Sequence, residues 1–166
     1  MSHATHCAYP EQRLQELRII LPPPVRPLGA YCESVQTGNL LFLSGTLPIE
    51  AGVPRYHGRI GDSLTIEEGQ QAARLAALNA VSLAKAHLGS LNRVQQVVRL
   101  GVSLVTTPEF REHPRVADGA SELLVSIFGA EKLSTRLVLG VNSLPVGLCV
   151  ELEVILEVTA PSAEGE

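Results

Sequence analysis

Alternating hydrophobic and polar positions predict strands in both halves of the chain. In residues 150–158, Val or Leu occupies every second position, and Glu occupies three of the four positions between them. Residues 98–104 alternate in the same way, and residues 137–141 form a short apolar run. Two more strands are expected over residues 30–36 and 40–44, joined by a Thr-Gly-Asn turn. A period of two is typical of a strand with one buried face.

The longest helix is expected to begin at Thr65 and to run to about Leu88. Thr65 and Glu68 have the spacing of a capping box, in which each side chain satisfies backbone groups at the helix start. Gly89 suits the position after the last helical residue. Asn79 falls on the apolar face of this helix, so its buried amide must find partners. We expect a structural hydrogen bond from Asn79 to the backbone of a loop.

Two further helices and two connections complete the pattern. A short helix is expected over residues 11–17, followed by Leu-Pro-Pro-Pro at 21–24, which must run extended as a stiff connector. A second long helix is expected from Pro114 to Phe128, closing at Gly129. Residues 50–63 form a long polar loop, of the kind that is often functional or mobile.

The order of strands, helix, strand, helix and strands predicts an α+β fold. It fits one mixed sheet with two helices packed on a single face, a ferredoxin-like or chorismate-mutase-like layer. A length of 166 residues fits one domain, residues 1–166, with frayed ends over about 1–10 and 160–166. The other sheet face carries a mixture of polar and apolar residues, which predicts a homo-oligomer.

Charge and composition argue against several classes of partner. The formal net charge is −4, and no Lys/Arg cluster provides a footprint for nucleic acid or an anionic membrane. No apolar run is long enough to cross a membrane, and the N-terminus lacks the pattern of a secretory signal. The three cysteines form no CxxC pair. We therefore expect a reduced, cytoplasmic setting, with Cys149 as a small core residue.

No sequence motif for a phosphate, a metal or a nucleophilic triad is present. The remaining candidates are Arg136, at the start of one C-terminal strand, and Glu151 in the next. If those strands form a hairpin, the two side chains lie near one end of the sheet. A guanidinium can grip a carboxylate with two hydrogen bonds, and a carboxylate can orient a water. The alternative is a cross-strand ion pair of Arg136 with Glu151 or Glu153.

Several residues taken in order resemble one known family. They are Tyr31 after Leu28-Gly29-Ala30, then Leu43-Ser44-Gly45, Gly69-Gln70 with Asn79, Arg136 followed by Leu144-Pro145, and Val150-Glu151-Leu152-Glu153. The set is similar to the YjgF/RidA family of imine and enamine deaminases, also labelled L-PSP endoribonucleases. The resemblance extends from about Leu17 to Val158, and residues 21–24 and 119–129 look like those of a longer subgroup.

The resemblance implies a chorismate-mutase-like fold and a homotrimer with ligand sites in the clefts between subunits. In such a site, Arg136 would bind the carboxylate of a small 2-imino or 2-oxo acid. Glu151 would hold the water that attacks the imine carbon, and Tyr31 would reach the cleft from the neighbouring subunit. The backbone of Ser44 and Gly45 would line the pocket. An iminium carbon is already electrophilic, so the reaction needs no cofactor.

Three positions depart from the family pattern. Thr46 stands where Gln usually follows Ser-Gly, Ser134-Thr135 replaces the usual pair before the arginine, and Asp118 stands where an Asn beside the ligand is expected. An ionised Asp118 would repel a carboxylate substrate unless it is paired. The leading interpretation is a hydrolase of 2-imino acids. A non-catalytic binder of small carboxylates is the alternative, and an endoribonuclease fits the acidic charge least well.

Overall fold

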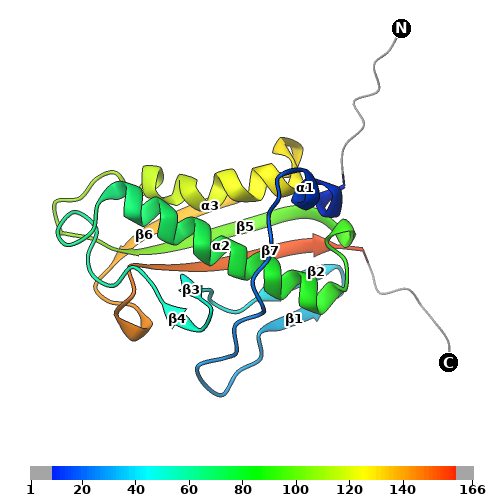
Figure 1. Ribbon diagram of the computed structural model, residues 1–166, viewed down its shortest axis with the longest axis horizontal. Coiled ribbons are helices and arrows are strands. Elements are labelled where there is room, and N and C mark those ends of the chain that lie inside the picture. The colour runs from blue at the N-terminus through cyan, green and yellow to red at the C-terminus, as the bar shows by residue number, and fades with distance from the viewer. Residues whose placement is uncertain (1–8, 160–166) are drawn as a thin grey trace, which may run out of the picture.

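A five-stranded mixed sheet with two helices on one face forms the centre of the molecule (Figure 1). The computed structural model describes residues 9–159. The strand order is β1-β2-β7-β5-β6, in which β6 is parallel to β5 and all other neighbours are antiparallel. The strands are β1 (Ser34–Thr37), β2 (Leu40–Leu43), β5 (Val94–Val105), β6 (Thr135–Val141) and β7 (Val150–Val158), and the covering helices are α2 (Ile66–Leu88) and α3 (His113–Phe128). The predicted layer of helices on one sheet face is confirmed.

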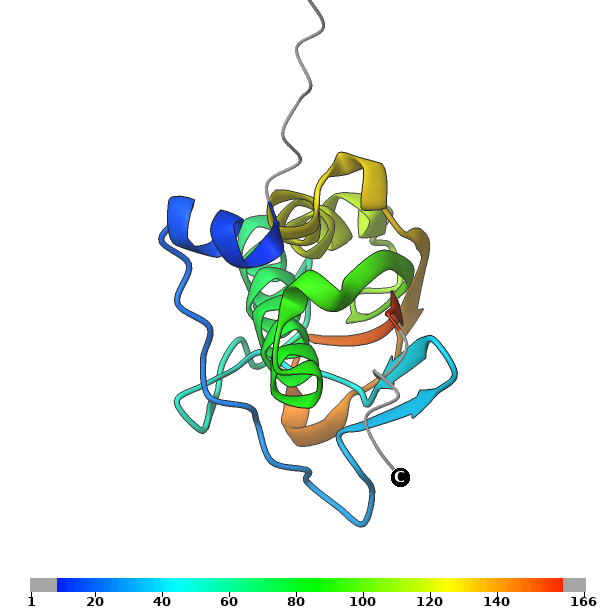
Figure 2. The same ribbon diagram turned by 90° about the vertical axis from the view of Figure 1, so that its right-hand side faces the viewer.

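The remaining elements border this layer. Helix α1 (Pro10–Glu16) packs near the end of α3, and the connector that follows it crosses over α2 before it reaches β1 (Figures 1 and 2). A small two-stranded sheet and three 3₁₀ turns complete the described residues: β3 (Ile49–Glu50), β4 (Val53–Pro54), η1 (Leu91–Arg93), η2 (Ala130–Lys132) and η3 (Pro145–Gly147).

Helix α2 has the ends that the sequence predicts. The Thr65 hydroxyl accepts a hydrogen bond from Glu68 N at 3.1 Å, and the Glu68 carboxylate accepts one from Thr65 N at 2.8 Å. Gly89 ends the helix with a φ of 76°, which a residue with a side chain adopts only at a cost. The helix packs closely on its neighbour, because a Cβ at Gly119 of α3 would overlap the Gln70 carbonyl of α2. Glycine at 119 is therefore a packing requirement.

The hydrophobic core lies between the helices and the sheet. Leu100 and Leu104 of β5, together with Leu152 and Leu156 of β7, are almost completely buried on the helix-covered face. Small residues such as Ala76 of α2 let the helix approach these leucines. Burying one such leucine contributes about 2 kcal/mol. The period of two in residues 150–158 is confirmed, since the buried positions of β7 are its even-numbered residues.

Two predicted element boundaries are wrong. Residues 30–33 are not part of a strand, and β1 begins only at Ser34, so Tyr31 lies on a loop. Pro10, which the composition assigns to a frayed end, begins α1 and is buried. The other residues of the two expected tails, 1–8 and 160–166, lie outside the described residues.

The hairpin considered for the two C-terminal strands does not form. Strand β5 lies between β6 and β7, so β6 is an edge strand. The chain leaves β5 through α3 and returns as the parallel strand β6, because parallel neighbours need a crossover connection. Strand β7, whose alternate positions are strongly apolar, takes the central place where both of its edges are hydrogen-bonded.

The segment 50–63, expected as a polar loop, is anchored to the end of the sheet. It contains the second strand of the β3–β4 hairpin, and Ile60 within it is fully buried. Ile60 N donates to Val105 O at 2.9 Å. The Arg59 guanidinium donates to the carbonyls of Thr106 and Asn142, which belong to two different segments. One buried isoleucine and one arginine therefore fix this loop to the sheet.

Candidate functional site

A β-bulge places the candidate pocket at one end of the sheet. Phe42 is paired with Ile155, and Thr46 is paired with Leu152. The chain advances by four residues from Phe42 to Thr46, whereas the paired stretch of β7 from Leu152 to Ile155 spans only three. The extra residue lies within Ser44-Gly45, where regular pairing is interrupted. Bulges of this kind bend a strand and redirect its side chains.

A cavity of about 370 Å³ opens beside the bulge. It is lined by residues of the loop before β1, the bulge, the 3₁₀ turn η3 and β7, namely Leu28, Gly29, Tyr31, Ser44, Gly45, Leu47, Pro145 and Glu151. The Glu151 carboxylate lies directly against Gly45, because a Cβ at position 45 would overlap Glu151 Oε1. Glycine at 45 therefore leaves the space that the carboxylate occupies.

Among the described residues, Glu151 is the only acidic residue that lines this cavity. Within residues 9–159, its side chain makes no hydrogen bond or ion pair. Burial raises the pKa of the Glu151 carboxyl above its ordinary value. Glu153, two residues further along the same strand, accepts a hydrogen bond from Arg99 Nε at 2.9 Å. Glu151, inside the cavity, therefore has no ion-pair partner among the described residues, whereas Glu153 is paired with Arg99.

Tyr31 and Ser44 are held next to Glu151 by the loop before β1. Tyr31 Oη accepts a hydrogen bond from Leu28 N at 3.0 Å, and half of the Tyr31 side chain is exposed. Ser44 Oγ donates to Cys32 O at 2.6 Å. The structure therefore brings Tyr31, Ser44, Gly45 and Glu151 together within one chain.

Arg136 lies on the edge strand β6 and is paired with α3. Its Nη1 donates to Asp118 Oδ1 at 2.7 Å and to Ser121 Oγ at 3.0 Å. Among the described residues, the Nε and Nη2 edge of the guanidinium has no hydrogen-bond partner. The alternative of an ion pair with Glu151 or Glu153 is wrong. Sequence reasoning missed Ser121, although its position three residues after Asp118 places both on one helix face.

Arg136 and Glu151 do not meet within one chain. Arg136 is level with Leu100 of β5, whose side chain faces the helices. Glu151 is level with Ser103, three residues further along β5 and on the open face of the sheet. This offset is roughly 10 Å along the strand, in addition to two strand spacings. The predicted site residues therefore fall into two groups, which we call the Glu151 group (Tyr31, Ser44, Gly45 and Glu151) and the Arg136 group (Arg136 and Asp118).

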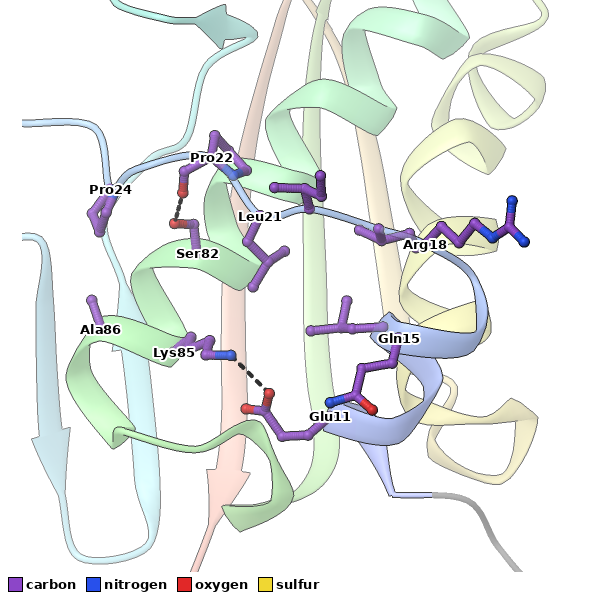
Figure 3. Close-up of a pocket in the computed structure, with 12 residues that line it drawn as sticks. Glu11, Gln15, Arg18, Leu21, Pro22, Pro24, Ser82, Lys85 and Ala86 are labelled. Carbon is purple, nitrogen blue, oxygen red and sulfur yellow. Dashed lines mark hydrogen bonds and ion pairs between the residues drawn. The ribbon is translucent and has the colours of Figure 1, made fainter.

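A separate hollow of about 640 Å³ lies between α1, the connector and α2 (Figure 3). Lys85 Nζ donates to the Glu11 carboxylate at 2.7 Å, and the Ser82 hydroxyl donates to Pro22 O. Burial raises the pKa of Glu11, but the hydrogen bonds from Lys85 and from Leu91 N outweigh it, so the pKa is lowered. These paired groups attach α1 and the connector to the long helix. None of the predicted site residues lines this hollow.

Other chemically reactive groups within residues 9–159 are not arranged as a site. Burial raises the pKa of the Cys149 thiol to about 12, so Cys149 is a core residue and not a nucleophile. The part of the chain that the structure describes contains no group of three or more His, Cys, Asp or Glu side chains that could hold a metal ion. Within residues 9–159, no helix has the length and apolarity needed to span a bilayer.

Comparison with known proteins identifies the family. Residues 11–156 match the family model described as "YjgF/chorismate mutase-like, putative endoribonuclease". The chain belongs to this family. The YjgF match covers both groups of site residues, the whole of β1, β2, β5 and β6, and β7 as far as Leu156.

Individual relatives agree with the family assignment. Protein TCP17 of Trypanosoma cruzi is 43% identical over 145 residues, which are 87% of this chain and 91% of that protein. The crystal structure of a "putative endoribonuclease" from Shewanella oneidensis is 34% identical with a TM-score of 0.87, over 91% of this chain and 100% of that one. RidA from Psychrobacter shares the fold at 24% identity, with a TM-score of 0.57 over 84% of this chain and 96% of that one. The expected chorismate-mutase-like α+β fold is confirmed.

Proposed function

We propose that this YjgF-family protein hydrolyses small 2-imino acids or their enamines to 2-oxo acids and ammonia. The observation that carries the proposal is the unpaired Glu151 carboxylate beside Gly45, in a cavity that Tyr31 and Ser44 also line. A carboxylate with a raised pKa is a suitable base for a water molecule near neutral pH. Apolar residues such as Leu28 and Leu47 also line the cavity.

The chemistry uses Glu151 twice. In the first step, its carboxylate takes a proton from water as the water oxygen bonds to the iminium carbon, which gives a carbinolamine. In the second step, the protonated Glu151 returns this proton to the amino nitrogen. The carbon–nitrogen bond then breaks. The hydroxyl becomes the carbonyl of the 2-oxo acid, and its proton goes to the departing ammonia, which leaves as ammonium. Atoms and charges balance without a redox partner, because the carbon does not change oxidation state.

Arg136 would bind the carboxylate of the substrate. The pair with Asp118 and Ser121 occupies Nη1 only, so the Nε and Nη2 edge remains suited to a two-pronged carboxylate contact. Pairing with Arg136 also reduces the repulsion that an isolated Asp118 would exert. Because Arg136 and Glu151 are separated within one chain, the complete site would combine the Glu151 group of one copy with the Arg136 group of another, in a homotrimer.

A coupled assay tests the activity. An amino-acid oxidase generates the 2-imino acid in the presence of semicarbazide, and hydrolysis by the protein competes with trapping. The wild type should decrease the trapped imine, and Arg136→Ala should lose most of this effect through weaker carboxylate binding. Arg74→Ala on the exposed face of α2 is the control and should behave as the wild type. Equal rates for wild type and Arg136→Ala would contradict the proposal.

Mixed oligomers test whether two copies share a site. Arg136→Ala and Glu151→Gln chains, each inactive alone, are co-expressed with different tags, and the mixed oligomers are purified. If one chain provides Glu151 and its neighbour Arg136, each mixed cyclic trimer contains one intact site, so the purified mixed oligomers regain about a third of the wild-type sites. No restoration in the mixed oligomers would show that the site is not shared. Light scattering of the wild type gives the oligomeric state directly.

The second candidate function is binding of small carboxylates without turnover. It is favoured by the Arg136–Asp118 ion pair, which joins the arginine to a fixed negative charge. Calorimetric binding of a 2-oxo acid, with no acceleration of imine hydrolysis, would support this function over catalysis. The endoribonuclease named in the family description is disfavoured by a net charge of −4. RNA cleavage that co-purifies with the protein and is lost in Arg136→Ala would support it.

A further inference from the structure

Two buried side-chain oxygens lie behind the candidate pocket without a hydrogen-bond partner. They are Thr46 Oγ1 and Asn79 Oδ1, and they are the only such buried side-chain atoms in residues 9–159. Thr46 is 4% exposed and Asn79 is 1% exposed. An unsatisfied buried polar group destabilises the folded protein. Here two of them occur close to a candidate site.

The orientation of the Asn79 amide is fixed by the hydrogen bonds of its nitrogen, Nδ2. Asn79 Nδ2 donates to Leu47 O at 2.8 Å and to Ile49 O at 2.9 Å, as the sequence predicts for a structural amide. A flipped amide would place Oδ1 against these two carbonyl oxygens, which cannot donate a hydrogen bond. Oδ1 is therefore an acceptor directed away from the β3 region, and it remains available for a donor.

Both residues line one small cavity that adjoins the Glu151 pocket. Its volume is about 30 Å³, and it shares Leu28, Tyr31 and Ser44 with the larger cavity around Glu151. The bulge accounts for this arrangement. Gly45 lies against Glu151, whereas Thr46 pairs with the buried Leu152 and so belongs to the helix-covered side, where Asn79 of α2 lies. The bulge thus separates a reactive pocket from an inner polar chamber.

The size and chemistry of the chamber indicate one kind of group. A volume of 30 Å³ is about the share of one water molecule in the liquid, which is also close to the size of a hydroxyl group. A hydroxyl can donate to Asn79 Oδ1 and accept from the Thr46 hydroxyl. An ammonium can donate but cannot accept, and a methyl group leaves both oxygens unsatisfied. The charged side chains at this cavity, Arg26 and Glu33, are at least partly exposed and can be solvated outside it.

We infer that the chamber formed by Thr46 and Asn79 is a specificity site for a hydroxyl group on the side chain of the substrate. On the basis of the proposed function, the preferred substrates are 2-imino or 2-oxo acids with a short hydroxylated side chain. The carboxylate and imine ends occupy the pocket of Glu151, and the hydroxyl reaches past Tyr31 and Ser44 into the chamber. Thr46 acts as a specificity-determining residue for the ligand side chain and takes no part in the proton transfers.

Calorimetry with two acids of nearly equal shape tests this inference. 4-Hydroxy-2-oxobutanoate and 2-oxopentanoate differ by a terminal hydroxyl in place of a methyl group. The wild type should bind the hydroxylated acid about tenfold or more tightly, since the methyl analogue leaves two buried oxygens unsatisfied. Thr46→Val, which replaces the hydroxyl by a methyl group, should lower this affinity ratio about tenfold.

Three further measurements separate specificity from simple damage. Thr46→Ser keeps the hydroxyl and should retain the ratio, and Thr37→Val, the same change at the exposed end of β1, should leave it unaltered. Thr46→Val should also raise, not lower, the midpoint of thermal unfolding, because it removes an unsatisfied hydroxyl. A lower midpoint would show that the hydroxyl has a structural partner, and it would contradict the inference.

The remaining outcomes are distinguishable from failure of the proposed function. Equal binding of the two acids by the wild type, a ratio insensitive to Thr46→Val, or no binding of either acid overturns the inference. The first two are the results expected if the chamber holds only an ordered water. A hydroxyl preference that depends on Thr46, without imine hydrolysis, contradicts the proposed activity alone. Imine hydrolysis without a hydroxyl preference contradicts the specificity site alone.

Discussion

The surroundings of Glu151 and Arg136 are opposite in character, although both residues are charged and both lie on strands of the same sheet. Glu151 has no polar partner in the described residues, and burial raises the pKa of its carboxyl. Arg136 is held by Asp118 and Ser121 from the helix that covers its face of the sheet. The environment of Glu151 suits a group that takes up a proton, whereas the environment of Arg136 suits a group that keeps a fixed position. The proposed base and the proposed carboxylate-binding residue would require these different environments.

The largest expected effect comes from removing the base. Glu151→Gln keeps the shape of the side chain but cannot accept a proton from water, so imine hydrolysis should decrease by about a hundredfold or more. The activity of the wild type should also decrease as the pH is lowered through the raised pKa of Glu151, because only the ionised carboxylate is a base. The measurement is the rate of imine hydrolysis against pH in the oxidase assay.

The matched control lies on the same strand and the same sheet face. Glu157 is at the far end of β7, where it accepts a hydrogen bond from Asn39 Nδ2 at 2.9 Å. Glu157→Gln should leave the hydrolysis rate and its pH dependence unchanged. If Glu151→Gln and Glu157→Gln have the same activity as the wild type, Glu151 is not the base and the contrast with Arg136 has no catalytic meaning.

A smaller effect is expected at the Arg136 group. Asp118→Asn keeps an oxygen that can accept from Arg136 Nη1 but removes the negative charge beside the guanidinium. The affinity for a 2-oxo acid should therefore increase by about three- to tenfold, with a weaker effect at high salt. Calorimetry at two ionic strengths measures this change. A decrease in affinity would show that the charge of Asp118 is needed to position Arg136. Glu122→Gln, on the same helix, is the control.

Local sequence signals account for most of the scaffold. The ends of α2 could be predicted because the capping box of Thr65 and Glu68 and the glycine at 89 act over a few residues. The burial pattern of β7 could be predicted because apolar residues alternate with other residues along this strand. The order of the strands could not, since the insertion of β5 between β6 and β7 depends on pairing between distant segments.

The candidate site was less accessible to sequence reasoning for the same reason. The strand pattern selected Glu151, and the resemblance to the YjgF family added Tyr31, Ser44 and Gly45. The structure brings these four residues together. Their convergence depends on the bulge between β2 and β7, which has no distinctive local pattern apart from the Ser-Gly pair. The separation of Arg136 from them was not predicted, because Asn142–Gly147 resembles a hairpin turn although the strands on either side do not pair.

The smallest expected effect concerns stability, and it tests whether Glu151 is truly unpaired. Since its pKa is raised in the folded state, the protonated form contributes stability below the ordinary pKa of a glutamate, and this contribution is lost as the pH rises through the raised value. At neutral pH the ionised carboxylate therefore weakens the fold slightly. Glu151→Gln should raise the thermal midpoint at pH 7 by roughly 1–3 °C, and the difference should disappear near pH 4. Differential scanning calorimetry of both proteins at the two pH values gives the comparison. A lower midpoint for Glu151→Gln at pH 7 would mean that the ionised carboxylate has a stabilising partner, and Glu151 would then resemble Arg136 instead of contrasting with it.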